Sequence, residues 1–111
     1  MSYENLDVWK RSCRLSIELY LVLASCKDYG FKDQITRSGL SIPSNIAEGY
    51  ERSSVKEKRQ FLYYAKGSSA ELRTQILIGQ KVGFIPKQKA LSWAEEILEI
   101  RKILNTLIKQ C

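Results

Sequence analysis

The sequence of 111 residues contains no histidine, the side chain that most often serves as a general base or a metal ligand. A serine or cysteine hydrolase with a histidine base therefore cannot be built from this chain. Three cysteines, Cys13, Cys26 and Cys111, are an odd number without CxxC spacing, so neither a disulfide framework nor a zinc site is expected. Walker A and GxGxxG motifs are also absent. Together these absences predict a protein that is not an enzyme and needs no metal or cofactor.

Long hydrophobic runs are missing as well. No apolar segment approaches the roughly 20 residues that a membrane-spanning helix requires, and the opening stretch MSYENLDVWKR lacks the features of a secretory signal. We therefore expect a cytoplasmic protein that makes no membrane contact. The length predicts one domain over residues 1–111, and a hydrophobic content of 44% is ordinary for a globular chain with a single core.

Glycine and proline are few, and they punctuate the chain at a small number of places. The DYGF stretch predicts a turn, GFIPK predicts a break, and Ser54 followed by Glu57 is typical of a helix-capping box. Apolar residues between these points recur at steps of three and four, as on a helix face, and no β-type alternation competes. The sequence therefore predicts an all-α protein, an antiparallel up-down-up-down four-helix bundle. The expected helices cover residues 5–27, 32–52, 54–82 and 86–110.

The second expected helix contains Pro43, which removes one backbone hydrogen bond and crowds the residue four positions earlier. That residue is Gly39, whose missing side chain adds nothing to the crowding. We therefore expect the helix to continue with a kink near Pro43. The alternative is that a new helix starts there, with Pro43 as its first residue.

Small and polar residues gather on the second and third expected helices. They indicate two backbones that approach closely and buried polar groups that need partners across the contact. We expect Glu71 to pair with Arg37 and Asn45 to lie near Phe61. A structural role is favoured over catalysis, because a nucleophilic serine has no base and Glu48 is expected far from Glu71. The predicted structural polar cluster is Arg37, Ser41, Ser44, Asn45, Glu48, Ser68 and Glu71.

Charge is distributed unevenly along the chain. Acidic and basic side chains balance in residues 1–53, so the net charge of +6 arises from residues 54–111. Arg59, Lys66 and Arg73 recur every seven residues and form one stripe on a helix. We expect this basic stripe to face outward, about 160° from the apolar stripe that begins at Phe61.

Tyr63 lies on the same stripe, between Arg59 and Lys66. Cations interleaved with an aromatic ring are typical of proteins that bind single-stranded nucleic acid, where phosphates contact Lys or Arg and a base stacks on the ring. A solvated helix face has a similar pattern, and Tyr63 in contact with a neighbouring subunit would also fit it. The candidate nucleic-acid-binding residues are Lys56, Lys58, Arg59, Tyr63, Lys66, Arg73 and Lys81.

Apolar residues exceed what one bundle core can bury. The first expected helix is apolar most of the way round near LYLVLA. A small bundle with a second apolar face normally buries it in an oligomer, so we expect self-association through helix faces.

The segments LDVWKRS, QITRSGLSIPSNIAEGYERSS, FLYYAKGSSAELRTQI and VGFI together resemble one family. It consists of small, ribosomal-protein-like four-helix proteins encoded within intervening sequences of bacterial 23S rRNA genes, and it includes the accessory variability protein of diversity-generating retroelements. The resemblance runs from about Leu6 to Ile108. It implies a four-helix bundle and a basic, ring-like homo-oligomer, typically a pentamer, without enzymatic activity. For the retroelement members it also implies binding to nucleic acid and to a reverse transcriptase.

Two positions differ from the family's common pattern: Lys66 stands where arginine is frequent, and Arg73 where glutamate is frequent. Both leave the stripe basic. The sequence therefore predicts a non-catalytic, basic homo-oligomer that binds nucleic acid, with RNA as the expected ligand. The alternative is an oligomeric scaffold or protein-interaction module, for example a partner of a reverse transcriptase, that does not contact nucleic acid directly.

Overall fold

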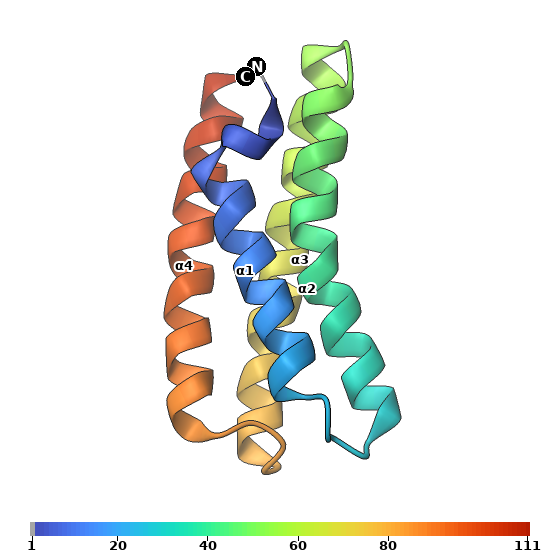
Figure 1. The fold of residues 1–111 in the computed structure, drawn as a ribbon. Helices are drawn as coiled ribbons and strands as arrows, with labels where there is room; N and C mark the ends of the chain where they lie inside the picture. Colours follow the sequence, from blue (N-terminus) through green and yellow to red (C-terminus); the bar gives the residue numbers. More distant parts are fainter. Residues whose placement is uncertain (1) are drawn as a thin grey trace.

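The computed structural model describes residues 2–111 and contains four long helices after a short 3-10 helix, η1 (Tyr3–Asn5). Successive helices run in opposite directions, so both chain ends lie at the same end of the molecule as the turn between the second and third helices (Figure 1). Each long helix packs on its neighbours in the chain, and the first also contacts the last. The predicted all-α antiparallel four-helix bundle is confirmed. The long helices are α1 (Asp7–Val22), α2 (Tyr29–Glu51), α3 (Val55–Lys81) and α4 (Lys87–Gln110).

Side-chain caps set the starts of α2 and α3. The Ser54 side chain accepts a hydrogen bond from the Glu57 backbone N–H at 3.3 Å, which confirms the expected start of α3. Asp28 does the same for α2, accepting from the Phe31 N–H at 3.1 Å. Because Asp is a strong N-cap, α2 begins at Tyr29, inside the stretch that was expected to be a turn.

α2 continues through Pro43 without a break, which excludes a new helix starting there. The bend at Pro43 stays a prediction. Gly39 has a second use in the fold, because a Cβ atom at this position would lie 2.5 Å from Leu19 Cδ1. The glycine therefore lets α1 pack directly on the backbone of α2.

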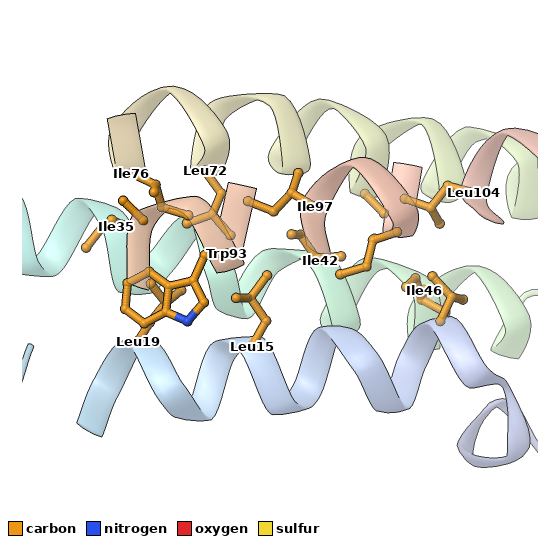
Figure 2. Close-up of a cluster of buried hydrophobic side chains, with 14 of the residues drawn as sticks. Leu15, Leu19, Ile35, Ile42, Ile46, Leu72, Ile76, Trp93, Ile97 and Leu104 are labelled. Carbon is orange, nitrogen blue, oxygen red and sulfur yellow. The ribbon is translucent and has the colours of Figure 1, made fainter. Parts of the chain in front are cut away.

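The core is a continuous column of aliphatic side chains contributed by all four helices. Figure 2 shows Leu19, Ile35, Ile42, Ile97 and Leu104 pointing toward this shared interior, and each of them is fully buried. Burial of such side chains is the main favourable term in folding. None of the helices in residues 2–111 combines the length and apolar character needed to cross a membrane.

Polar contacts tie α1 to α4 beside this column. The Arg11 guanidinium donates to both carboxylate oxygens of Glu96, at 2.9 and 2.6 Å. Near the other end of α1, Glu18 is bonded to two residues of α4. The Trp93 indole Nε1 donates to Glu18 Oε1 at 3.1 Å, and Lys89 Nζ donates to the same oxygen at 3.3 Å. The ionised form of Glu18 is therefore held by two donors from α4.

Glu18 should make stability sensitive to acid. The Trp93 hydrogen bond, helped by Lys89 and opposed by partial burial, lowers the pKa of Glu18 from its usual value of 4.5. A carboxyl group whose folded pKa is lowered stabilises the fold above its unfolded pKa, and this stabilisation disappears as pH falls through the folded pKa. We expect Glu18→Gln to show a smaller drop in melting temperature than the parent on acidification below pH 4.5. Identical acid profiles, measured by circular dichroism, would contradict this coupling.

Candidate nucleic-acid interface

Two hydrogen bonds join α2 to α3 in a single antiparallel register. Ser38 Oγ donates to Glu71 Oε1 at 2.9 Å, and the hydroxyls of Ser41 and Ser68 bond each other at 2.8 Å. Asn45 supports this contact from within α2, since its Nδ2 donates to the backbone carbonyl and the hydroxyl of Ser41, at 2.8 and 2.9 Å. We call these five residues the polar seam. The polar seam shows which flank of α3 faces α2.

Arg37 lies outside the polar seam, and its expected pair with Glu71 does not form. Its Nε donates to Asp33 Oδ2 at 3.0 Å, one turn earlier on α2, and its side chain is 76% exposed. Ser38 takes the position opposite Glu71 instead. One residue along a helix is a rotation of about 100°, so Ser38 and Arg37 cannot both face α3.

Ser44 and Glu48 also lie outside the seam. Glu48 is exposed and forms an ion pair with Arg52 at 3.4 Å, within the last turns of α2. Ser44 lines a shallow hollow between η1, α1 and α2, together with Trp9 and Cys13. The sequence had suggested one polar cluster, whereas Arg37, Ser44 and Glu48 are exposed on α2 and take no part in the bonds between α2 and α3.

The polar seam offers no arrangement that resembles a catalytic site. Its hydroxyls and its carboxylate are bonded to one another across a packed helix contact. Burial raises the pKa of the Cys13 thiol, which disfavours the nucleophilic thiolate. Residues 2–111 bring together no group of three or more His, Cys, Asp or Glu side chains that could hold a metal ion.

The basic stripe lies on the flank of α3 that faces α4. Arg59 Nη2 donates to the backbone carbonyl of Cys111, directly after α4, at 2.8 Å. This is a favourable place for a cation, because unpaired carbonyls make the C-terminal end of a helix negative. Lys66 and Arg73 are half-buried, and the Nε atom of Arg73 is buried without a hydrogen-bond partner among residues 2–111.

The expected outward position of the stripe holds for Arg59, which is exposed, but not for Lys66 and Arg73, and the reason is definable. That expectation took Phe61 as part of the centre of the buried face, but Phe61 is only half-buried and packs beside Gly49 of α2. At 100° per residue the buried face centres between Ala65 and Ile76, both fully buried. Arg59, Lys66 and Arg73 stand roughly 70–110° from this centre, at the border between core and solvent. The buried residues of α3 are Leu62, Ala65, Ser69, Leu72, Ile76 and Gly79.

The other candidate binding residues occupy different parts of α3. Lys56, Tyr63 and Lys81 are exposed along its outer side. Lys58 is half-buried, with its Nζ atom 4.6 Å from the centroid of the Tyr50 ring, so this cation already has an aromatic partner. The structure thus brings Arg59, Tyr63, Lys66 and Arg73 to one side of α3, while Lys58 turns toward α2.

The family model of the 23S rRNA-intervening sequence protein matches residues 4–106. The chain belongs to this family. A solved structure has the same fold: a crystal structure, at 1.70 Å resolution, of a protein of unknown function from the S23 ribosomal protein family of Bacteroides thetaiotaomicron VPI-5482. It aligns with a TM-score of 0.85 and 25% identity, over 92% of this chain and 98% of that chain. No curated protein matches the chain.

Gly67 of this 23S rRNA-intervening sequence family member does not lie in the contact between α2 and α3, where small polar residues of both helices meet. It is exposed instead, and a Cβ atom built on it would meet nothing within 4 Å. Its spacing of four residues after Tyr63 is the signal in the sequence that connects it to the basic stripe.

Proposed function

We propose that this family member is a non-catalytic accessory protein that binds nucleic acid, with RNA as the expected ligand, and that it acts as a homo-oligomer. The observation that carries the proposal is that the α3 cations have no carboxylate partners in the part of the chain that the structure describes. Within residues 2–111, none of the six Lys and Arg side chains of α3 forms an ion pair with a carboxylate. Outside α3, five of the twelve Lys and Arg side chains have such partners: Arg11, Arg37, Arg52, Lys89 and Lys102.

Six cations on one helix whose charge no side-chain carboxylate of residues 2–111 neutralises create a positive potential that attracts polyanions. Successive cations of the basic stripe are separated by seven residues, or about 10 Å along a helix. Lys56 and Lys81 extend the charged surface toward both ends of α3. These features support contact with several phosphates of one strand, which is the main source of affinity for most nucleic-acid-binding proteins.

Exposed apolar side chains support the homo-oligomeric part of the proposal. Ile17, Leu21 and Leu40 are exposed on α1 and α2, on a side of the bundle away from the basic stripe. Apolar surface of this kind usually marks a protein contact. We propose that copies of the chain associate through it, in the ring, typically a pentamer, that the family resemblance implies. The same surface favours the second candidate function, a scaffold that contacts a protein such as a reverse transcriptase.

A salt titration tests the nucleic-acid function. In the variant Arg59→Gln, Lys66→Gln, Arg73→Gln, the slope of log K against log salt should become shallower by about 2, because each lost phosphate contact removes roughly 0.7–0.9. Binding of a labelled single-stranded RNA, measured by fluorescence anisotropy at several salt concentrations, gives the slope. Circular dichroism checks that the variant is folded.

A control with the same loss of charge isolates the stripe. Lys10, Arg14 and Lys27 are exposed and have no carboxylate partner in residues 2–111, so the variant Lys10→Gln, Arg14→Gln, Lys27→Gln should keep the parent slope. If the stripe variant keeps the parent slope, or if the control loses as much, the stripe is not the binding surface. Absence of RNA binding by the parent, together with a stable oligomer, would favour the scaffold.

A further inference from the structure

We infer that Tyr63 is the stacking platform for an unpaired base and that Gly67 is the residue that keeps its ring open. The inference rests on the proposed nucleic-acid function and narrows the ligand to a single strand. Arg59 precedes Tyr63 by four residues and Lys66 follows it by three, so both cations are its neighbours on the helix surface. Phosphates on either side of the stacked base would contact them.

Gly67 has no use inside the bundle. Three of the four other glycines within helices mark places where two elements touch. A Cβ atom on Gly39 would lie 2.5 Å from Leu19, on Gly49 3.1 Å from Phe61, and on Gly79 2.6 Å from Phe31. At Gly67 the same atom meets open space, although glycine in the middle of a helix weakens it.

The side chain that position 67 lacks would have covered a neighbouring part of the α3 surface. Side chains on a helix lean toward its N-terminus, and residues four apart are neighbours on its surface. A side chain at position 67 would therefore lie over the turn that carries Tyr63. Its absence leaves one side of the Tyr63 ring free, beside the basic stripe.

Tyr63 differs from its neighbour Tyr64 in the contacts of its ring and hydroxyl. Tyr64 is similarly exposed, at 49% against 51%, but its ring packs edge-on against Phe61 at 5.4 Å and its hydroxyl accepts from Gln60 at 2.9 Å. Within residues 2–111, Tyr63 has no aromatic, cation–π or side-chain hydrogen-bond partner. Half of a large ring is thus left to solvent on the most positive helix of the chain.

The open ring selects the class of ligand. Bases in a duplex are stacked on each other and cannot lie on a side chain, whereas an unpaired base of any type stacks readily on tyrosine. Because every base can stack on a tyrosine ring, we expect little sequence preference at the surface over Tyr63 and Gly67, which we call the slot. The ligand is therefore a flexible single strand, or a loop with unpaired bases.

Two variants test the slot from opposite sides. Tyr63→Leu removes the ring and keeps apolar bulk, whereas Gly67→Leu keeps the ring and covers it. Each should weaken binding of a 12-nucleotide single-stranded RNA about tenfold, as expected when one stacked base is released. Binding of the duplex formed with the complementary strand should stay unchanged. Because both changes remove the same contact, the double variant should lose no more than either single one.

Matched controls come from the same helix. Tyr64→Leu removes an equally exposed tyrosine, and Thr74→Leu places a leucine on the same helix seven residues beyond Gly67; both should bind the single strand like the parent. If the stripe variant loses RNA while Tyr63→Leu and Gly67→Leu bind normally, the slot is wrong and the proposed function stands. If the parent binds no RNA, both fail. If Gly67→Leu changes only the oligomer size in light scattering, the glycine serves a protein contact and the inference is overturned.

Discussion

Trp93→Ala is expected to lower the free energy of unfolding by about 3–5 kcal/mol, the usual cost of truncating a buried tryptophan. Trp93 is 2% exposed, and Figure 2 shows its ring among the aliphatic side chains of the core. Alanine leaves a cavity there and also removes the indole donor that holds Glu18. Urea denaturation followed by circular dichroism measures the loss, since the main fluorescent probe of the core is deleted with the side chain.

Trp9→Ala is the matched control for this prediction. Trp9 lies at the edge of the core, half-buried, where its ring packs edge-on against Tyr3 at 5.4 Å. The same atoms are deleted, but less apolar surface was buried and a smaller cavity remains. The loss should therefore be clearly smaller than for Trp93→Ala. Equal losses would show that burial in this structure does not describe the energetics of the core.

The elements of the fold could be predicted because local signals and packing agree. Apolar residues repeat with the helical period in all four segments, and Ser54 with Glu57 marks a helix start that the structure keeps. The start of α2 could not be read in the same way, since the DYGF stretch also favours a turn. The deciding contact is the Asp28 cap on Phe31, which competes with the turn only once the rest of the helix is packed.

The direction of the basic stripe was harder to predict than its existence. Ser69 lies on the buried face of α3, but a serine gives no hydrophobic signal. It can be buried because its hydroxyl donates to the Lys66 carbonyl at 2.6 Å, within its own helix. Phe61, where the expected apolar stripe begins, stands about 50° from the centre of the buried face. Measuring from Phe61 therefore placed the cations too far outward, and Lys66 and Arg73 lie half-buried instead.

The polar seam shows the same limit. The sequence identified Ser41, Asn45, Ser68 and Glu71 as members, and the structure brings these four together. The partner of Glu71 could not be predicted from the sequence, because Arg37 carries the opposite charge and is the more obvious choice. Arg37 finds a nearer carboxylate in Asp33, one turn away on its own helix, at little entropic cost.

Gly39→Leu is expected to destabilise the protein by about 3 kcal/mol, the upper end of the usual cost of overpacking a filled core. The first added carbon would already stand 2.5 Å from Leu19 Cδ1 and 3.8 Å from the Ser16 Cα atom. Leu19 is fully buried, so it has no free space into which it can turn, and the remaining atoms of the new side chain would have to push α1 away from α2.

The same substitution at Gly67 separates this steric effect from any general response of a helix to leucine. Gly67 has no atom within 4 Å of its Cβ position, and leucine is a better helix former than glycine by about 0.8 kcal/mol. Gly67→Leu should therefore leave stability unchanged or raise it, while Gly39→Leu lowers it, in parallel denaturation curves. If both variants lost the same amount of unfolding free energy, the close packing of α1 on α2 would not be the cause of the destabilisation by Gly39→Leu. Because filling Gly67 should not unfold the bundle, any loss of RNA binding by that variant can be assigned to the surface of α3.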